Sequence, residues 1–486
     1  MDVLIVATAC APLTGDGPAA RDVAGLVRAL ASCGHEVRLA LPLSSSIDRS
    51  RAGLSPSGIM LHARAGDRLQ LGRVWTGSGP GGACLYAIEL QGAGELETED
   101  LNQIGVFCQL VPQLQVRFSW RPEVVHCHEW QTAPVCAHAG AAWGISGGPA
   151  SVLTVHDAAR QGVAARERWS ALGLPDDRFA GGPFEMGGAI NCLKGGVETA
   201  VLVTAALPSY AARLRRPGTG CGLEGSFGAR GEDLIGVLHG LDAEAWNPSG
   251  GFGLAMPFSA AQPAGKSVCK LVLQRELKLA ERHELVVAVP GLGGDPEATG
   301  WLAGALEQLV TALPVQLILI GGDELEDAWR SRAAAQPARV AYVREADEAL
   351  QRRIAAGADA MLPVSDGRAG AFGHLHGMRY GAVPIVRRLD GATDGVVELA
   401  PSTLSDGTAS GLVYDGTGPR ALVDALVRAV GASEDAGVWA GLMRGAMQQD
   451  LSWAAAAEAY RDIYERATAS ALASALAARL SAANGR

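Results

Sequence analysis

Short apolar runs alternate with segments of helical spacing along the first half of this chain. Residues 3–7 and 36–41 are apolar enough for buried strands, and residues 22–33 between them repeat apolar side chains at helical spacing. A strand, a helix and a strand in this order favour a parallel sheet. Residues 43–100 are rich in Gly, Ser and Arg and predict no clear element. The pattern predicts further strands at 124–126, 151–155 and 201–204 and a helix over 102–116.

A second series of strands and helices fills most of the remaining chain. Between the two series, residues 247–262 are rich in Gly, Pro and Ser, which is typical of an inter-domain linker. The alanine-rich segment 453–482 predicts a helix. The pattern therefore predicts two doubly wound α/β domains, 1–246 and 263–450, followed by a helical segment, 451–486. The strands of the second domain are predicted at 285–289, 315–320, 340–343, 360–363 and 383–386.

Length, charge and cysteine usage restrict the classes of function. The 486 residues are too many for one core, so two domains are expected. The formal net charge of −10 argues against nucleic acid or an anionic membrane as the main partner. The nine cysteines are dispersed, and no apolar run is long enough to span a bilayer, so we expect a cytoplasmic protein.

A polar, histidine-rich tip follows the predicted strand at 124–126. Its side chains are His126, His128, Trp130 and Gln131. Because ligands of open α/β sheets bind beyond the carboxyl ends of parallel strands, these residues are candidates for the floor of a substrate cleft. Packing that shapes the cleft without touching a ligand is the alternative. His126 and His128 share one face of the strand, but no third ligand follows at a suitable spacing, so we predict no metal site.

Motifs in a fixed order link the two predicted domains to a known family. They include Thr-Val-His-Asp at 154–157, Gly-Ala-Ile-Asn-Cys-Leu-Lys at 188–194, Gly-Leu-Asp at 240–242 and Arg-Tyr-Gly-Ala-Val-Pro-Ile at 379–385. With these motifs the chain resembles bacterial glycogen synthases and plant starch synthases, the retaining glucosyltransferases that use ADP-glucose. The resemblance implies the GT-B fold, in which two Rossmann-like domains face each other across a cleft, and it implies no cofactor.

The resemblance also implies which positions should neutralise the donor diphosphate as its bond to glucose breaks. The family Lys of a Lys-X-Gly-Gly motif falls on or near Asp16, and an Arg and a Lys of the second domain fall on Gly291 and near Pro296. The family Glu beside the sugar falls on Gly367 or Arg368. Losing one well-placed donor raises a barrier by about 3–4 kcal/mol. The replacements therefore predict that glucosyl transfer is absent or very weak.

Other family positions are matched in this chain. Asp22 falls on a family Asp, with a helix N-cap before Val23 as the alternative role. His156 falls on the family His that approaches the donor sugar, with a strand-end histidine bonded to a neighbouring loop as the alternative. Asp157 replaces a family Asn and is a candidate for substrate binding.

A glycine-rich loop of the second domain is implied to hold phosphate. Gly391, Thr393 and Asp394 lie in this loop, and Gly391 can still present backbone donors to an anion. Gly321 follows the predicted strand at 315–320 and is a further candidate for the nucleotide side.

Three hypotheses about function remain open from the sequence. The first is an active α-1,4-glucan synthase. The second is a non-catalytic relative that binds ADP-glucose, ADP, an α-glucan or a partner such as a catalytic synthase subunit. The third is a transferase with an altered donor, whose candidate cations are Arg160, Arg368 and Arg387.

Overall fold

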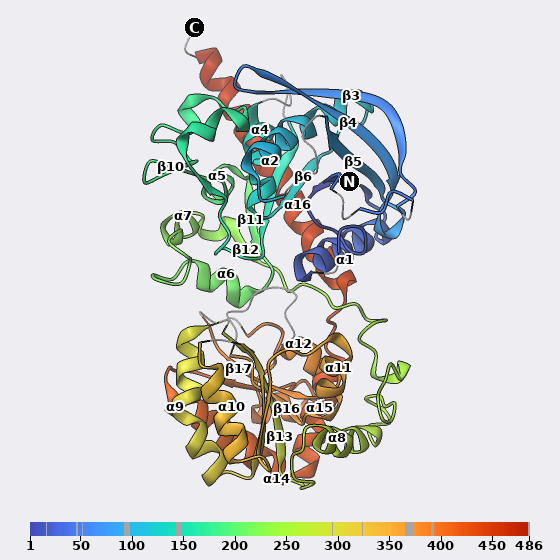
Figure 1. Cartoon of the computed structure of the whole chain (residues 1–486), viewed down its shortest axis with the longest axis vertical. Helices are drawn as coiled ribbons and strands as arrows, with labels where there is room; N and C mark the ends of the chain where they lie inside the picture. The colour runs from blue at the N-terminus through green and yellow to red at the C-terminus, as the bar shows by residue number, and fades with distance from the viewer. Residues whose placement is uncertain are drawn as a thin grey trace. The chain divides into compact units, whose positions relative to one another are not determined.

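The computed structural model describes residues 1–15, 17–44, 47–50, 52–91, 98–141, 148–293, 295–322, 324–364, 373–389 and 393–484. The predicted site positions Asp16, Gly367, Arg368 and Gly391 lie outside these residues. The chain forms two compact units (Figure 1), one of Met1–Gly240 with Trp453–Arg486 and one of Leu241–Ser452. Each unit is built on its own sheet, and each is described by itself below.

The sheet of the first unit has nine described strands, in the order β12-β11-β7-β6-β1-β2-β5-β4-β3. Neighbours run parallel from β12 to β5, whereas β4 pairs antiparallel with both β5 and β3. A small antiparallel sheet, β8-β10-β9, lies apart from it. The strands are β1 (Asp2–Val6), β2 (Glu36–Pro42), β3 (Ser55–Ala65), β4 (Arg68–Ser78), β5 (Cys84–Leu90), β6 (Val124–His128), β7 (Ala150–Val155), β8 (Val163–Ala164), β9 (Glu185–Met186), β10 (Ala189–Asn191), β11 (Leu202–Ala205) and β12 (Leu234–Gly236).

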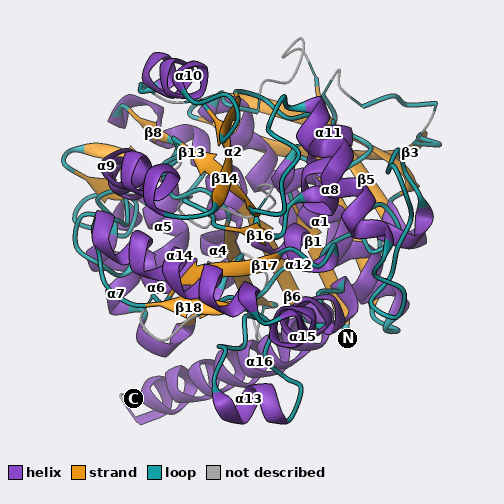
Figure 2. Cartoon of the chain, turned by 90° about the horizontal axis from the view of Figure 1, so that it is seen from below, coloured by secondary structure: helices purple, strands orange, loops and turns teal. Residues whose placement is uncertain are grey.

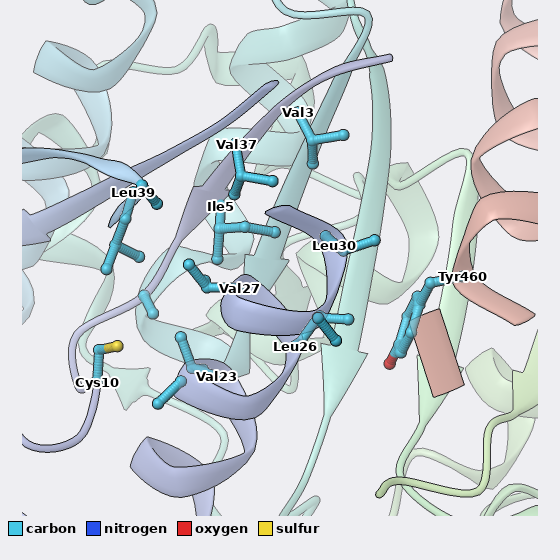
Figure 3. Close-up of a cluster of buried hydrophobic side chains, with 14 of the residues drawn as sticks. Val3, Ile5, Cys10, Val23, Leu26, Val27, Leu30, Val37, Leu39 and Tyr460 are labelled. Carbon is cyan, nitrogen blue, oxygen red and sulfur yellow. The ribbon is translucent and has the colours of Figure 1, made fainter. Parts of the chain in front are cut away.

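Parallel strands leave both faces of this sheet apolar, and helices cover them. Val23, Leu26 and Val27 of the first helix pack with Val3 and Ile5 of β1 in one buried cluster (Figure 3). The helices of the unit are α1 (Pro18–Ser32), α2 (Leu101–Leu110), α3 (Leu114–Arg117), α4 (Glu129–Ala141), α5 (Cys192–Thr199), α6 (Pro208–Leu214), α7 (Glu224–Ala229) and α16 (Trp453–Asn484).

The predicted helix over 102–116 is interrupted in the structure. It divides into α2, a 3-10 turn over Val111–Gln113, and α3. Pro112 lies in the turn, and proline offers no backbone N–H for a continuous helix. The prediction that 102–116 is helical is confirmed, although the turn divides the segment into two α-helices. The strands predicted at 3–7, 36–41, 124–126, 151–155 and 201–204 are confirmed within a few residues.

The strands β3, β4 and β5 lie in the region for which the sequence predicts no clear element. Side chains of α2 and the turn after it hold the edge strand β3. Gln109 Nε2 donates to the carbonyl of Arg64 at 2.9 Å, and Gln113 Nε2 donates to that of His62 at 2.8 Å. These bonds satisfy backbone groups that an edge strand leaves open.

The last helix, α16, belongs to the first unit although it follows the second unit in sequence. It is one long helix (Figure 2), and its red ribbon in Figure 1 lies beside the blue and green elements of the first unit. Tyr460, Ile463 and Tyr464 are buried in the cluster formed by β1 and α1. The ring of Trp453 fills the space beside Gly25, where a Cβ atom would come within 2.2 Å of it.

The second unit is built on a parallel sheet with the order β15-β14-β13-β16-β17-β18. The predicted strands of this half are confirmed, although the strand at 360–363 is shorter than predicted. The strands are β13 (Leu285–Leu292), β14 (Val315–Gly321), β15 (Val340–Val343), β16 (Ala360–Met361), β17 (Val383–Arg387) and β18 (Leu412–Tyr414). The helices are α8 (Gly265–Glu276), α9 (Pro296–Ala312), α10 (Glu326–Ala335), α11 (Glu348–Gly357), α12 (His374–Arg379), α13 (Pro401–Ser405), α14 (Pro419–Glu434) and α15 (Ala436–Gln448).

The segment predicted as a linker, 247–262, falls inside the second unit. Trp246 and Phe258 are buried with Tyr380 in one cluster, so the segment is packed against this unit. The division between the units comes earlier, after Gly240. Among the described helices, none is both long enough and apolar enough to cross a membrane.

Candidate functional site

Histidine side chains gather at the carboxyl ends of β6 and β7 in the first unit. His126 is fully buried, and its Nδ1 lies 2.8 Å from the hydroxyl of Tyr464 while its Nε2 lies 2.6 Å from Thr154 Oγ1. Both ring nitrogens of His126 are therefore bonded inside the unit. The contacts of this predicted substrate-binding residue join β6 and β7 to α16.

His128 and His156 form the next layer of the cluster. His128 stacks on His126 with ring centroids 4.3 Å apart, which places both rings on one face of β6 as expected. His128 Nδ1 lies 3.1 Å from His156 Nε2, while His128 Nε2 is buried with no hydrogen-bond partner among the described residues. His156 Nδ1 lies 3.4 Å from Asp22 Oδ2. The His156 ring is thus surrounded by protein groups and is 4 % exposed.

Asp22 lies inside α1, because the helix begins at Pro18. Proline is well suited to the first position of a helix, because a backbone N–H there would have no hydrogen-bond acceptor within the helix. The interpretation of Asp22 as an N-cap was therefore wrong. Its carboxylate instead lies 3.0 Å from Nδ1 of His239, whose Nε2 lies 2.9 Å from the hydroxyl of Tyr460.

The charges in this cluster depend on one another. Burial alone would raise the pKa of Asp22, but the neighbouring His239 and His156 together lower it to about 2. Burial would lower the pKa of His156, yet Asp22 and Glu129 raise it overall. For His239, burial prevails over Asp22 and lowers the pKa. Asp22 is therefore an ionised carboxylate inside the fold, and His156 is the ring that most readily carries the compensating proton.

Glu129 is a further member of the cluster that was not among the predicted site residues. Its backbone adopts φ 68°, which is uncommon for a residue other than glycine and occurs often at functional sites. Its carboxylate accepts hydrogen bonds from the backbone N–H of His156 at 2.5 Å and of Asp157 at 3.0 Å. Glu129 therefore fixes the loop that carries His156.

Trp130 and Gln131 follow Glu129 and are both buried. Trp130 packs against Gly162, where a Cβ atom would lie 2.0 Å from the indole ring. The amide of Gln131 donates to the Glu99 carboxylate at 3.1 Å. Both side chains contact protein, in agreement with local packing, and their predicted substrate contacts stay a prediction.

His239 was missed because no strand was predicted at 234–236 and only the Gly-Leu-Asp motif after the histidine was singled out. A polar residue directly after the apolar run 234–238, whose first three residues form β12, was the available signal. The prediction of no metal site considered only His126 and His128. The structure instead brings together Asp22, His156 and His239 from three distant segments.

In the second unit, the positions onto which the resemblance places the family Arg and Lys lie where β13 leads into α9. Gly291 adopts φ 93° at an irregularity of the β13–β14 pairing, and Pro296 is the first residue of α9. Asp295 caps the helix, since its Oδ1 accepts from the N–H of Glu297 at 3.0 Å and of Ala298 at 3.1 Å. Two carboxylates therefore stand at a helix N-terminus, where a phosphate could otherwise bind.

The other predicted phosphate contacts have structural partners of their own. Gly321 ends β14 with φ 126°, and a Cβ atom there would lie 2.6 Å from the carbonyl oxygen of Leu292. Thr393 Oγ1 donates to the carbonyl of Val396 at 2.9 Å, and Asp394 accepts on its own carbonyl from His374 at 3.3 Å. These contacts are consistent with structural roles of the three residues in turns and packing. Their contacts with a nucleotide stay a prediction.

Two of the three arginines that could bind phosphate in a transferase with an altered donor, Arg160 and Arg387, are among the described residues. Arg160 of the first unit forms an exposed ion pair with Glu99. Arg387 ends β17 in the second unit, and its guanidinium carbon lies 4.9 Å from the ring centroid of Trp301 on α9. Arg387 is therefore held against the same helix whose start carries Asp295.

Comparisons with known proteins agree with the geometry of both units. Residues 2–228 match the family model for the starch synthase catalytic domain. The glycogen synthase of Aromatoleum aromaticum is 32 % identical over 455 residues, covering 90 % of this chain and 91 % of the relative. That of Burkholderia thailandensis is 34 % identical over 458 residues, covering 90 % of this chain and 85 % of the relative.

Solved structures show the same fold. The catalytic domain of starch synthase IV from Arabidopsis thaliana, bound to ADP and acarbose, superposes with a TM-score of 0.77 at 24 % identity and covers 96 % of this chain and 99 % of its own. Sucrose-phosphate synthase from Thermosynechococcus elongatus gives a TM-score of 0.53 at 16 % identity, covering 96 % of this chain and 99 % of its own. The predicted GT-B fold is thereby confirmed, and the chain belongs to the family of glycogen and starch synthase-like glycosyltransferases.

Proposed function

We propose that this family member transfers glucose from ADP-glucose very weakly or not at all, and acts by binding a nucleotide or an α-glucan. The start of α9 carries the proposal. There, Asp295 uses the first free backbone N–H groups of the helix, and Glu297 adds a second carboxylate within the same turn. A helix N-terminus of this kind repels a diphosphate.

The chemistry of the family's transfer reaction makes this arrangement unfavourable. Negative charge builds on the leaving diphosphate as the bond to glucose breaks, and preorganised positive groups must stabilise it. Gly291 and Pro296 stand where the resemblance places an Arg and a Lys, and neither carries a charge. Since each lost donor raises the barrier by about 3–4 kcal/mol, two lost donors slow the reaction by several orders of magnitude, although not additively.

The retained fold supports a binding role. The starch synthase IV catalytic domain is described with ADP and acarbose bound, and this chain shares its fold over almost the whole length. A catalytic synthase subunit is the partner that such a binding protein would assist. ADP, ADP-glucose and maltooligosaccharides are therefore the ligands to test.

A direct assay tests the loss of activity. The pure protein is incubated with labelled ADP-glucose and glycogen, with an active bacterial glycogen synthase as the positive control, and label in polymer is measured. We expect no turnover above background. Turnover in the usual enzyme range of about 1–10³ per second would overturn the proposal. Calorimetry with ADP, ADP-glucose and maltooligosaccharides then separates a binding protein from one that binds none of them.

Restoring one cation should not restore transfer. In Asp16→Lys the positions Gly291 and Pro296 remain uncharged, so we expect polymer labelling to stay at background. A variant that combines Asp16→Lys with Pro296→Lys and Asp295→Ser should bind ADP more tightly than either the parent or the single variant. A large gain in transfer from Asp16→Lys alone would contradict the electrostatic account.

A second candidate function is transfer from a different donor. Arg387 favours it, because this cation lies against Trp301 on the helix that begins at Asp295. Screening other nucleotide sugars for transfer to maltooligosaccharides tests this candidate. Any activity found in the parent protein is then measured in two variants, Arg387→Ala and Arg420→Ala, the second of which changes an exposed arginine. Loss of that activity in Arg387→Ala but not in Arg420→Ala would assign the phosphate contact to Arg387.

A further inference from the structure

Three side chains of metal-ligating types converge in the first unit. Asp22 comes from α1, His156 follows β7 and His239 follows β12. One atom of each, Asp22 Oδ2, His156 Nδ1 and His239 Nδ1, lies within 4.8 Å of the other two. All three residues are at least nine-tenths buried, with exposed fractions of 5, 4 and 5 %.

The spacing of these atoms fits a small transition-metal ion. With bonds of about 2.0–2.2 Å, neighbouring donor atoms of a tetrahedral Zn²⁺ site lie roughly 3.3–3.6 Å apart. Asp22 Oδ2 lies 3.4 Å from His156 Nδ1 and 3.0 Å from His239 Nδ1. The two histidine atoms lie within 4.8 Å of each other, so modest side-chain shifts would place all three ligands around one ion.

One of the three ligand atoms makes no well-formed hydrogen bond. His156 Nδ1 is buried, and no contact of it among the described residues has hydrogen-bond geometry, although it lies at ion-pair distance, 3.4 Å, from Asp22 Oδ2. A buried polar atom without a well-formed hydrogen bond costs free energy. A metal ion between the three residues would remove that cost.

The outer contacts of the two imidazoles also suit a metal site. Each ring that binds a metal through Nδ1 must carry its proton on Nε2 and donate it to a neighbour. His239 Nε2 lies 2.9 Å from the Tyr460 hydroxyl, and His156 Nε2 lies 3.1 Å from Nδ1 of His128. Both partners can accept, which leaves the proton of His128 on its Nε2, a buried atom with no hydrogen-bond partner among the described residues.

We propose that Asp22, His156 and His239 form a binding site for a divalent transition-metal ion of the Zn²⁺ class. Two imidazole nitrogens and one carboxylate favour Zn²⁺ or Co²⁺ over Mg²⁺ and Ca²⁺, which prefer oxygen ligands. The ion would join α1 to the segments after β7 and β12 at a place where α16 also packs. The site shares His156 with the position that the resemblance places beside the donor sugar, but metal binding itself needs neither nucleotide nor glucan, so it can be tested separately from the proposed function.

Metal titration of the full chain tests the proposal. The protein is freed of metal with a chelator, its exposed thiols Cys33 and Cys221 are blocked with iodoacetamide, and Zn²⁺ is added in a calorimeter. We expect one Zn²⁺ per chain and a higher melting temperature. Co²⁺ should give the visible absorption of a site with nitrogen and oxygen ligands, without the intense charge-transfer band of thiolate ligands.

Variants assign the ligands. His239→Asn can still donate a hydrogen bond to Asp22 but offers no imidazole, and we expect at least a tenfold weaker affinity for Zn²⁺. Tyr460→Phe removes the outer partner of His239 and should weaken binding about 10–100-fold. His62→Ala changes an exposed histidine of β3 and should leave the affinity unchanged.

Two results would overturn the proposal. One is the absence of saturable Zn²⁺ binding by the folded parent protein, which leaves Asp22 and His239 as a hydrogen-bonded pair only. The other is binding of one Zn²⁺ with unchanged affinity in a folded His239→Asn variant, which would place the ion elsewhere. Circular dichroism of each variant shows whether it is folded.

Discussion

At the scale of single residues, the buried His138, outside the cluster of Asp22, His156 and His239, contributes to the response of the first unit to acid. His138 lies in the last turn of α4, and its Nε2 lies 2.9 Å from the carbonyl oxygen of Leu172. Burial lowers the pKa of His138, although the bond to this carbonyl opposes the shift. In the fold, His138 is therefore a neutral ring that donates one hydrogen bond.

The sign of the pH effect follows from this shift. Below the ordinary histidine pKa of about 6.5, the unfolded chain binds a proton at His138 that the folded chain does not. Stability is therefore lost as pH falls through that range, by at most about 1.4 kcal/mol per pH unit from this one residue. His138→Gln keeps a donor for Leu172 without titrating.

Urea unfolding at pH 7.5 and pH 5.5 measures the effect. We expect the parent protein to lose more stability than His138→Gln between the two conditions, because the other buried histidines titrate equally in both proteins. His62→Gln changes an exposed ring and should follow the parent. An equal loss in the parent and in His138→Gln would show that His138 does not contribute.

At the scale of elements, the close approach of two neighbouring strands requires glycine at position 321. Gly321 ends β14 beside Leu292 of β13, in a backbone conformation with φ 126° that only glycine adopts easily. Gly300 lies in the middle of α9 with nothing within 4 Å of a Cβ atom. The two positions therefore predict opposite effects of the same substitution.

Alanine substitutions at Gly321 and Gly300 distinguish the effect of strand packing from the effect of helix propensity on stability. We expect Gly321→Ala to lower the free energy of unfolding by about 1–3 kcal/mol, because the added Cβ meets a carbonyl oxygen in a strained conformation. Gly300→Ala should raise it by about 0.5–1 kcal/mol, because alanine restricts the unfolded chain. Denaturant unfolding of both variants checks the pair, and equal effects would contradict the strand-packing argument.

Elements with continuous apolar or helical patterns could be predicted from the sequence. The strands that form β2 and β17 are apolar along most of their length, and parallel strands covered on both faces require this. The strands β3 and β4 could not be predicted, because exposed polar residues and glycines interrupt their alternation. The two strands are held by pairing with each other and by hydrogen bonds from α2 to β3. Such long-range contacts cannot be seen in the pattern of a single sequence.

The candidate site was predictable only in part for the same reason. His128 and His156 stand at strand ends, where the βα pattern places ligand-binding residues. Their neighbours Asp22, His239 and Tyr460 come from segments that meet only in the folded unit. The sequence therefore indicated the correct edge of the sheet but not the partners that the histidines bind there.

At the scale of the whole molecule, α16 completes the first unit, although the residues that precede it in the sequence, Leu241–Ser452, form the second unit. Tyr460, Ile463 and Tyr464 are buried in the core of the first unit, whereas Leu472, Leu476 and Leu480 are exposed at fractions of 72, 58 and 58 %. The first half of α16 therefore carries the packing.

Truncation tests this division of α16. A chain that ends at Ser452 loses the buried tyrosines, exposes the core of β1 and α1, and should be insoluble or digested rapidly by protease in its first unit. A chain that ends at Ala473 keeps every residue of α16 that the structure describes as buried and should melt within a few degrees of the parent. Equal protease resistance of the two truncated chains would show that α16 is dispensable.

The discontinuous first unit also sets an order for folding during translation. The ribosome releases Leu241–Ser452 as one uninterrupted stretch, before any of Trp453–Arg486 has been made. The second unit can therefore be completed first, although domains usually fold in order from the N-terminus. Met1–Gly240 must wait with an apolar surface still uncovered until α16 has been made, which makes the newborn chain dependent on chaperones during that time.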